Sequence, residues 1–438
     1  MAKGVVKGKG PALRSAEREA GTVLPPPPRN PRFPLFDPLR AVAATAILLV
    51  HVGLFTGGFE PIPLQLFSHL DIGVPFFFLI SGFLLYRPFL AARHLEAPAV
   101  RNRDYARNRF FRIFPLYWVV LTITAIVPGM YGAFTGDWWV YYGLLQNFPV
   151  YTAGQGCLDD PFTCAIPPAW TLTLEVGFYI LLPFLAAGIA GLTRLFGRNR
   201  WVAVNLGVFA AISVASVFIQ ADMPDGAAEQ WLFFSPLARG WWFALGMIFA
   251  TLSVLHRKTG RIPPGVNWLA KRPGTAWLTA GLLYAGMTFV LLDPVPTLNY
   301  MTTSRFEYLS QYLLDGVIVA LLALPAVFAR PRALPERLLM HPVPVYLGLI
   351  SYGIFLWHFP VMVGLARIGV GEIWPAMSYP LFAMASFAVT VALAAITYRL
   401  VERPMMTWSR RRGTGRAGDP EASVPAAALP AAATRSAP

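Results

Sequence analysis

The feature that most constrains this chain is a series of apolar runs, each about 20 residues long. A run of that length, wound as an α-helix, crosses the roughly 30 Å hydrocarbon layer of a bilayer. Charged side chains make up 13% of the 438 residues, well below the roughly 25% usual in soluble domains. The sequence therefore predicts an all-α polytopic membrane protein of about ten transmembrane helices. The candidate segments lie near 38–57, 73–91, 113–130, 171–192, 201–219, 234–254, 275–292, 309–328, 344–364 and 377–401.

The basic residues between these runs predict the topology. Lys and Arg are frequent in the N-terminal arm, in 93–112, 194–200, 257–272 and 330–337, and in the tail from Arg403. They are absent or single in the alternate segments 58–71, 131–170, 220–235, 293–308 and 366–376. Because Lys and Arg favour the cytoplasmic side, we expect both termini in the cytoplasm and the protein in the inner (plasma) membrane. The net charge of +14 is scattered rather than gathered on one face, so we expect no nucleic-acid partner.

Composition divides the chain into three regions. Residues 1–35 form a basic, Pro-rich arm that we expect to be disordered, 36–404 form the membrane domain, and 405–438 form a second disordered tail. No cleavable signal peptide is expected, because the first apolar run begins far from the first residue. Cys157 and Cys164 are the only cysteines, in a segment expected outside, where a disulfide and two free thiols both remain open. We expect no metal site there, since no further ligand accompanies them.

The first span, RAVAATAILLVH, begins with Arg40 and ends with His51. An ionisable group within a span costs several kcal/mol unless it is paired or hydrated, so each one is a functional hypothesis. Eleven residues at 100° each place the two side chains within about 20° of one another and roughly 16 Å apart along the helix. With the N-terminus inside, Arg40 lies near the cytoplasmic end and His51 lies beyond the midplane.

A basic set is expected at the cytoplasmic depth. Arg109 and Arg112 flank the start of the third span, near the level of Arg40, and Glu402 closes the tenth span. Guanidinium groups bind phosphate oxygens bidentately and stay charged when desolvated, which suits a phosphate-bearing ligand from the cytosol. The simpler alternative, that these arginines only anchor helix ends, stays open.

A second set is expected in the outer half. Glu175 and His358 fall there with His51, and Ser81 lies nearer the middle. A histidine with a carboxylate suits general acid–base work on a hydroxyl. The alternatives are that His51 packs between helices and that His358 is interfacial. Asp315, inside the eighth span, has no expected partner.

Six motifs in order resemble the membrane-bound acyltransferase-3 family, which includes O-acetylases of bacterial surface glycans. The resemblance covers about residues 33–405 and departs from the family at Pro38, where glycine is usual, and at Pro75 and Trp242, where acidic residues are common. The motifs are FDPLRAVAATAILLVH, GVPFFFLISGFLL, RNRFFRIFPLYW, AWTLTLEVGFYILLPFL, ISYGIFLWHFPV and YRLVERP.

The resemblance implies transfer of an acyl group, acetyl or short-chain, from cytosolic acyl-CoA to a hydroxyl of a cell-envelope glycan, glycolipid or small-molecule acceptor. Acyl-CoA, expected to be acetyl-CoA, is then a donor substrate, with no bound cofactor and no metal. His51 is expected to act as general base or, alternatively, to take the acyl group itself, and Glu175 to orient it. The expected substrate-binding residues are Arg40, Arg109, Arg112, Ser81, His358 and Tyr179.

Two other functions fit parts of the sequence. A proton-coupled secondary transporter would use His51, Glu175 and Asp315 as a relay, but it does not explain arginines gathered at one depth. An acyl conduit serving a separate transferase would need a partner domain, which we do not expect within these 438 residues.

Overall fold

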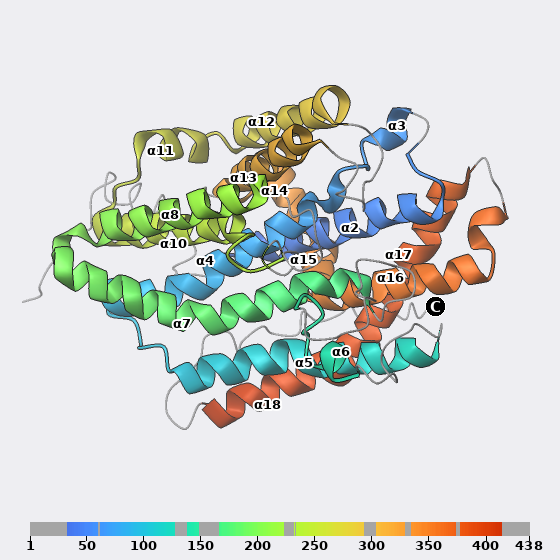
Figure 1. Cartoon of the computed structure of the whole chain (residues 1–438), viewed down its shortest axis with the longest axis horizontal. Coiled ribbons are helices and arrows are strands. Elements are labelled where there is room, and N and C mark those ends of the chain that lie inside the picture. Colours follow the sequence, from blue (N-terminus) through green and yellow to red (C-terminus); the bar gives the residue numbers. More distant parts are fainter. Residues whose placement is uncertain are drawn as a thin grey trace, which may run out of the picture.

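The computed structural model describes residues 33–59, 62–127, 138–148, 166–222, 232, 234–292, 304–328, 334–373 and 377–413. Every regular element in these ranges is helical, and each of the ten predicted spans has a helix (Figure 1). The long helices are α2 (Phe36–Phe55), α4 (Gly73–His94), α5 (Asn102–Ile126), α7 (Trp170–Phe196), α8 (Trp201–Ala221), α10 (Gly240–Thr259), α12 (Pro273–Gly286), α13 (Arg305–Phe328), α15 (Pro342–Leu349) with α16 (Ser351–Arg367), and α17 (Ser378–Thr397).

The remaining elements are short. They are α3 (Ile62–Gln65), η1 (Leu70–Ile72), α6 (Trp138–Tyr142), η2 (Pro167–Ala169), η3 (Arg198–Arg200), α11 (Pro264–Ala270), η4 (Met287–Leu291), α14 (Leu334–Leu339), η5 (Val370–Glu372), η7 (Tyr398–Glu402) and α18 (Arg403–Gly413). Cys157 and Cys164 lie outside the described residues.

The prediction of an all-α polytopic membrane protein is confirmed, with a slightly smaller number of clear spans. Within the described ranges, eight helices are long and apolar enough to cross a membrane, or nine if α15 and α16, bent by 72°, form one span. The predicted segment that does not qualify is the sixth, 234–254, which corresponds to α10; this helix is 20 residues long but ends in His256, Arg257 and Lys258. Those three charged or polar side chains explain why α10 is less apolar than its neighbours.

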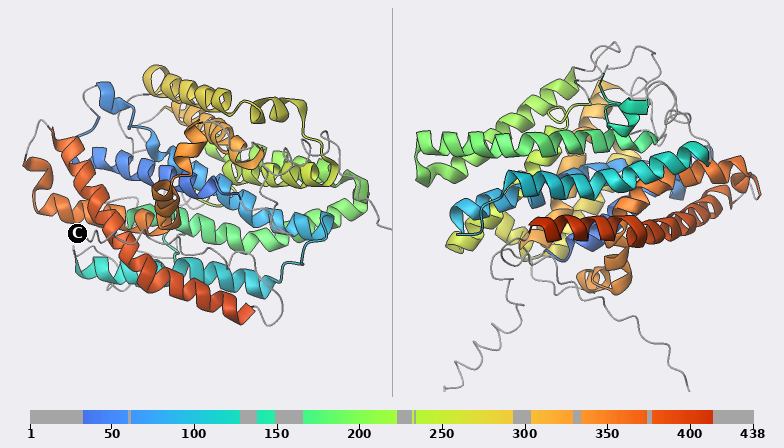
Figure 2. Two further views of the ribbon diagram at one scale, coloured as in Figure 1. Left: turned by 180° about the vertical axis from the view of Figure 1, so that it is seen from behind. Right: turned by 90° about the horizontal axis from the view of Figure 1, so that it is seen from below.

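Two helices extend beyond their predicted limits. α5 begins at Asn102, so Arg109 and Arg112 lie inside a helix of 25 residues rather than before its start. Beyond α17, the chain continues through the π-helical turn η7 into α18, so residues 405–413 of the predicted disordered tail are helical. α18 lies alongside α5 in both views of Figure 2.

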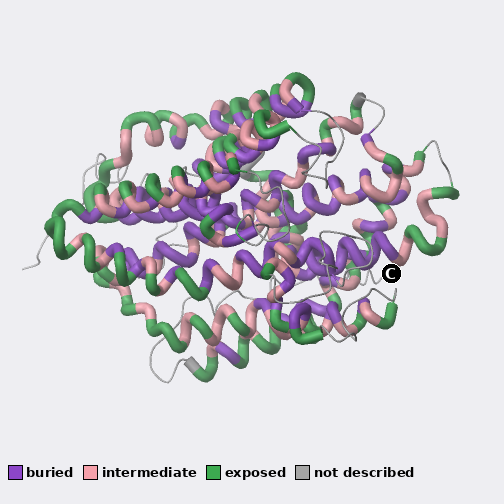
Figure 3. The backbone as a smooth tube through the Cα atoms, in the orientation of Figure 1, coloured by how far each residue is buried: buried purple, intermediate pink, exposed green. Residues whose placement is uncertain are grey.

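The most extensive helix contact joins α4 and α10, and two glycines make it possible. A Cβ at Gly82 would lie 2.3 Å from the carbonyl oxygen of Phe243, and one at Gly246 would lie 2.0 Å from that of Leu79. The two backbones therefore touch, as in other membrane helix pairs that use small residues. This pair forms the buried centre of the bundle (Figure 3).

The outer helices show the opposite pattern. On α7, Ile180, Leu181 and Phe184 are exposed by 62%, 52% and 71%, although all are apolar. Apolar side chains on the outer face of a long apolar helix are what contact with lipid requires. α2, by contrast, lies inside, where its start packs on α15 so closely that a Cβ at Gly348 would be 1.8 Å from the Asp37 carbonyl oxygen. The central position of α2 fixes both Arg40 and His51.

Candidate active site

Arg40 and His51 lie on one unbroken helix, as the sequence predicts. Both fall within α2, which runs from Phe36 to Phe55 without an internal proline beyond its first turn. The helical rise therefore keeps them roughly 16 Å apart. The other predicted residues gather around these two ends and between them.

At the far end of α2, His51 pairs with His358 of α16. The Nδ1 atoms of the two rings lie 2.7 Å from the Ile47 carbonyl oxygen and 2.6 Å from the Phe355 carbonyl oxygen, respectively. A carbonyl oxygen only accepts, so Nδ1 of each ring donates, and Nε2 of His358, 3.3 Å from Nδ1 of His51, is an acceptor. In the neutral ring, Nε2 of His51 then keeps its lone pair. His358 is fully buried behind it.

A second cluster lies between the ends of α2. Ser81 of α4 donates a hydrogen bond of 2.7 Å to Oε1 of Glu175 on α7, and the hydroxyl of Tyr179 donates to the same oxygen. Tyr105 of α5 donates to the Tyr179 carbonyl oxygen at 3.2 Å. The Glu175 carboxylate thereby joins α4 to α7, and the backbone of Tyr179 joins α5 to the same cluster.

The expected pairing of Glu175 with His51 is not formed. In the described structure, the hydrogen bonds of Glu175 go to Ser81 and Tyr179, and Glu175 lies within electrostatic range of Arg40. Depth counted along separate helices did not reveal this grouping, because it depends on the packing of α4 against α7.

At the near end of α2, three arginines converge. Arg40 bonds Asp37 at 3.2 Å and lies within electrostatic range of Arg112. Arg112, itself half-buried, contacts buried Glu402 at 3.4 Å. The guanidinium carbon of Arg109 lies 5.9 Å from the Tyr179 ring centroid. Within the described residues, Nε of Arg109 is buried without a hydrogen-bond partner.

A cavity opens beside His51. Besides the second half of α2, its walls come from the first half of α13, from the starts of α4, α7, α10 and α16, and from the short segments just before α4 and α7. α4, α7, α10 and α13 all begin on the side opposite Arg40. The two departures from the family pattern, Pro75 and Trp242, lie in its wall. Asp315, which had no expected partner, also lines it.

Sequence reasoning missed most of this cavity's polar lining. Asp71 and Arg239 lie near helix starts and were not singled out, and neither was a face of α13. The local signal was present on α13: Tyr308, Gln311, Tyr312 and Asp315 stand at the i, i+3, i+4 and i+7 spacing that lines one helical face.

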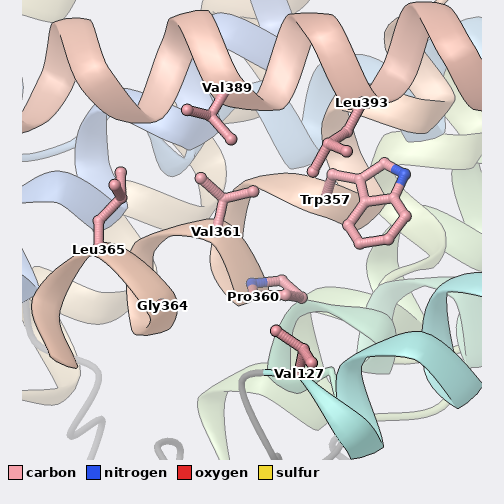
Figure 4. Close-up of a pocket in the computed structure, with 8 residues that line it drawn as sticks. All are labelled: Val127, Trp357, Pro360, Val361, Gly364, Leu365, Val389 and Leu393. Carbon is pink, nitrogen blue, oxygen red and sulfur yellow. The ribbon is translucent and has the colours of Figure 1, made fainter. Parts of the chain in front are cut away.

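Figure 4 shows a second hollow, between α16, α17 and the end of α5. No ionisable side chain lines it, so it offers no acid, base or ligand for a metal. Among the residues that the structure describes, no group of three or more His, Cys, Asp or Glu side chains is arranged to hold a metal ion. The lining residues are Val127, Trp357, Pro360, Val361, Gly364, Leu365, Val389 and Leu393.

Comparison with known proteins decides the family. Residues 34–399 match the acyltransferase domain family Acyl_transf_3. The chain belongs to this acyltransferase-3 family. It is therefore a membrane acyltransferase, and the family predicted from the six motifs is confirmed.

Several relatives share the domain at low identity. YrhL of Bacillus subtilis and OatA of Listeria monocytogenes, both named as peptidoglycan O-acetyltransferases, are 25% and 21% identical over 86% and 85% of this chain. The chain spans only 55% of the length of each. Nodulation protein 10 of Rhizobium leguminosarum bv. viciae is 27% identical, over 85% of this chain and 92% of its own length. No solved structure matches the chain.

Proposed function

We propose that this acyltransferase moves an acetyl group from cytosolic acetyl-CoA to a hydroxyl of a cell-envelope glycan or glycolipid. The family and the names of the relatives support the reaction class. One observation carries the proposal: His51, whose Nδ1 is tied to a backbone carbonyl, presents a basic Nε2 at a cavity on the same helix as Arg40.

The proposed orientation has both termini in the cytoplasm of an inner (plasma) membrane protein, with the arginines facing the cytosol. The alternation of basic loops supports it. The placement of the cavity also supports it, because the starts of α4, α7, α10 and α13 in its walls follow chain segments poor in Lys and Arg. The acceptor would then enter from the outer side.

The donor end would hold the CoA phosphates. Of the three arginines, Arg109 has an Nε atom that is buried without a hydrogen-bond partner among the described residues. Arg112 and Arg40 each have one carboxylate neighbour that fixes the orientation of the guanidinium. Guanidinium groups so oriented form bidentate, charge-assisted bonds to phosphate. The pantetheine arm would pass between α4 and α7, along the cluster of Ser81, Glu175 and Tyr179, and carry the thioester toward His51.

The chemistry then needs one base. Nε2 of His51 takes the proton of the acceptor hydroxyl as its oxygen attacks the thioester carbonyl carbon. The tetrahedral intermediate collapses, the carbon–sulfur bond breaks, and the CoA thiolate takes the proton from His51. The products are the acyl ester and CoA. His358, which is too buried to meet the substrate, acts as a positioning residue: its Nε2 accepts from the Nδ1 proton of His51 and stabilises the imidazolium.

The test is release of free CoA by purified protein in nanodiscs supplied with acetyl-CoA and an envelope extract. Wild type should release CoA with the extract present, and His51→Gln should lose about 10²- to 10⁴-fold of that rate, the usual worth of a general base. The exposed His341 provides the control, since His341→Gln should keep the full rate. A rate that His51→Gln leaves unchanged would refute the proposal, and no release at all would favour a transporter.

A further inference from the structure

The wall of the cavity contains a carboxylate oxygen that nothing in the described structure satisfies. Asp315 is 3% exposed, lines the cavity, and its Oδ1 has no hydrogen-bond partner among the described residues. A buried polar atom left unsatisfied costs about 1–3 kcal/mol, and more when it is charged. An acceptor atom that faces a cavity in this state indicates a ligand that donates hydrogen bonds.

A second carboxylate stands close to the first. Gln311 donates to both oxygens of Asp71, at 3.4 and 3.2 Å, so its amide fixes the orientation of this group. Asp71 and Asp315 lie within electrostatic range of each other and of Arg239. Two carboxylates and one guanidinium leave the cavity without a surplus of positive charge.

Arg239 is held among aromatic rings. It is 3% exposed, donates a 3.0 Å hydrogen bond to the hydroxyl of Tyr308, and lies 5.6 Å from the ring of Trp170 and 5.3 Å from that of Trp242. A guanidinium fixed in this way balances the neighbouring carboxylates. Because the two carboxyl groups already share this one guanidinium, a further carboxylate brought in by a ligand would have no countercharge of its own in the cavity.

Aromatic rings supply the rest of the recognition surface. Trp170, Trp242, Tyr308 and Tyr312 all line the cavity, on three different helices or helix starts. A mostly apolar wall with a few placed polar groups is the usual composition of a site for a small organic ligand. Flat aromatic faces beside buried acceptors suit a ring that carries hydroxyl donors at its edge and C–H groups on its faces.

We propose that this cavity selects a sugar ring that carries no acidic group, with Asp315 and Asp71 accepting its hydroxyl protons and the aromatic rings packing against its faces. The inference deepens the proposed function, on which it rests for the role of His51: the selected ring presents one further hydroxyl to Nε2. Uronic acids and other carboxylated sugars are excluded by charge.

The experiment is saturation-transfer NMR on the full chain in nanodiscs, without acyl-CoA, using matched sugar pairs. The probes are the methyl glycosides of glucose and galactose and their uronate counterparts. At least one neutral glycoside should bind saturably and at least tenfold more tightly than its uronate. Equal or tighter binding of the uronates, or no saturable binding by any probe, overturns the proposal.

Two variants test the assigned residues. Asp315→Asn should weaken binding of the neutral glycoside about 10- to 100-fold, as expected when a charge-assisted hydrogen bond is lost. Asp71→Asn should reduce the difference in binding affinity between the neutral glycoside and its uronate. Asp222→Asn, at an exposed position, is the matched control and should change neither value.

Acetyl-CoA binding by each variant reports correct folding, because the donor end lies away from the cavity. Unchanged selectivity in folded Asp315→Asn and Asp71→Asn variants would remove these residues from recognition. The binding assay does not depend on transfer. If the sugars bind as expected and yet no CoA is released, the proposed function fails while the sugar site stands.

Discussion

Removal of the Arg109 side chain should weaken binding of the acyl-CoA donor and leave the rate of acyl transfer nearly unchanged. The Nε atom of Arg109 is buried without a hydrogen-bond partner in the described structure, while Arg40 and Arg112 each contact a carboxylate. Arg109 can therefore turn to a ligand without breaking an existing ion pair. In the proposed function, that ligand is a phosphate of acyl-CoA.

The magnitude follows from the bond that is lost. A hydrogen bond to a charged group contributes about 1.5–3 kcal/mol, which corresponds to roughly a 10- to 150-fold rise in the KM for acetyl-CoA. The kcat should stay within about threefold of wild type, because Arg109 is remote from His51 and binds donor and transition state alike. Arg109→Lys should recover part of the loss, since Lys keeps the charge but not the bidentate geometry.

Steady-state CoA release at varied acetyl-CoA, with saturating acceptor, gives both constants. A second donor, acetyl-pantetheine, has no phosphate, and with it Arg109→Ala and wild type should have the same KM. The control is Arg101→Ala, because the Arg101 side chain is 76% exposed and this residue directly precedes the first residue of α5. If Arg109→Ala raises the KM equally for both donors, or lowers kcat instead, the assignment of Arg109 to the phosphates is wrong.

Three further predictions concern the supports of the site. His358→Phe should lower kcat by roughly 3- to 10-fold through loss of one hydrogen bond to His51 and shift the pH–rate profile, without changing the KM for acetyl-CoA. Glu175→Gln should keep the thermal stability, because its remaining oxygen still accepts from Ser81 and Tyr179, whereas Glu175→Ala should cost about 1–3 kcal/mol; thermal unfolding in detergent distinguishes the two. Gly246→Leu should lower the midpoint of that unfolding by overpacking worth at least about 1–3 kcal/mol, while Gly281→Leu, with open space around it, should not.

The membrane fold could be predicted because its signal is local. A run of 20 apolar residues specifies a helix by itself, so each predicted span has a helix in the structure. The predicted ends of the helices were less accurate where polar residues continue a helix. α5 extends back to Asn102 and α18 extends on to Gly413 through stretches rich in arginine. Apolarity ends there, but hydrogen bonding along the backbone does not.

Part of the site could also be predicted, because the spacing of Arg40 and His51 lies within one helix. The side chains that contact each of these residues could not be predicted. Glu175 was expected beside His51 and instead binds Ser81 and Tyr179, and His358 takes the place beside His51. Such pairings depend on how helices rotate and tilt against one another, and a single sequence holds no measure of that.

The cavity was even harder to predict from the sequence, because it too depends on how the helices pack. Its lining comes from six helices and from the segments just before α4 and α7, and each contributes only a few residues. The one visible pattern, on α13 from Tyr308 to Asp315, identifies a polar helical face without showing what it faces. Only the packing of α13 beside α4 and α10 turns that face toward His51.

In the proposed function, His51 is the base for acyl transfer to an envelope acceptor. The most direct test compares, by mass spectrometry, the envelope glycans and lipids of cells that express wild type, His51→Gln or the control His341→Gln at matched membrane abundance. We expect one species to carry an added acetyl mass with wild type and with His341→Gln, and to lack it with His51→Gln. The same acetylated species in all three cells would contradict the account.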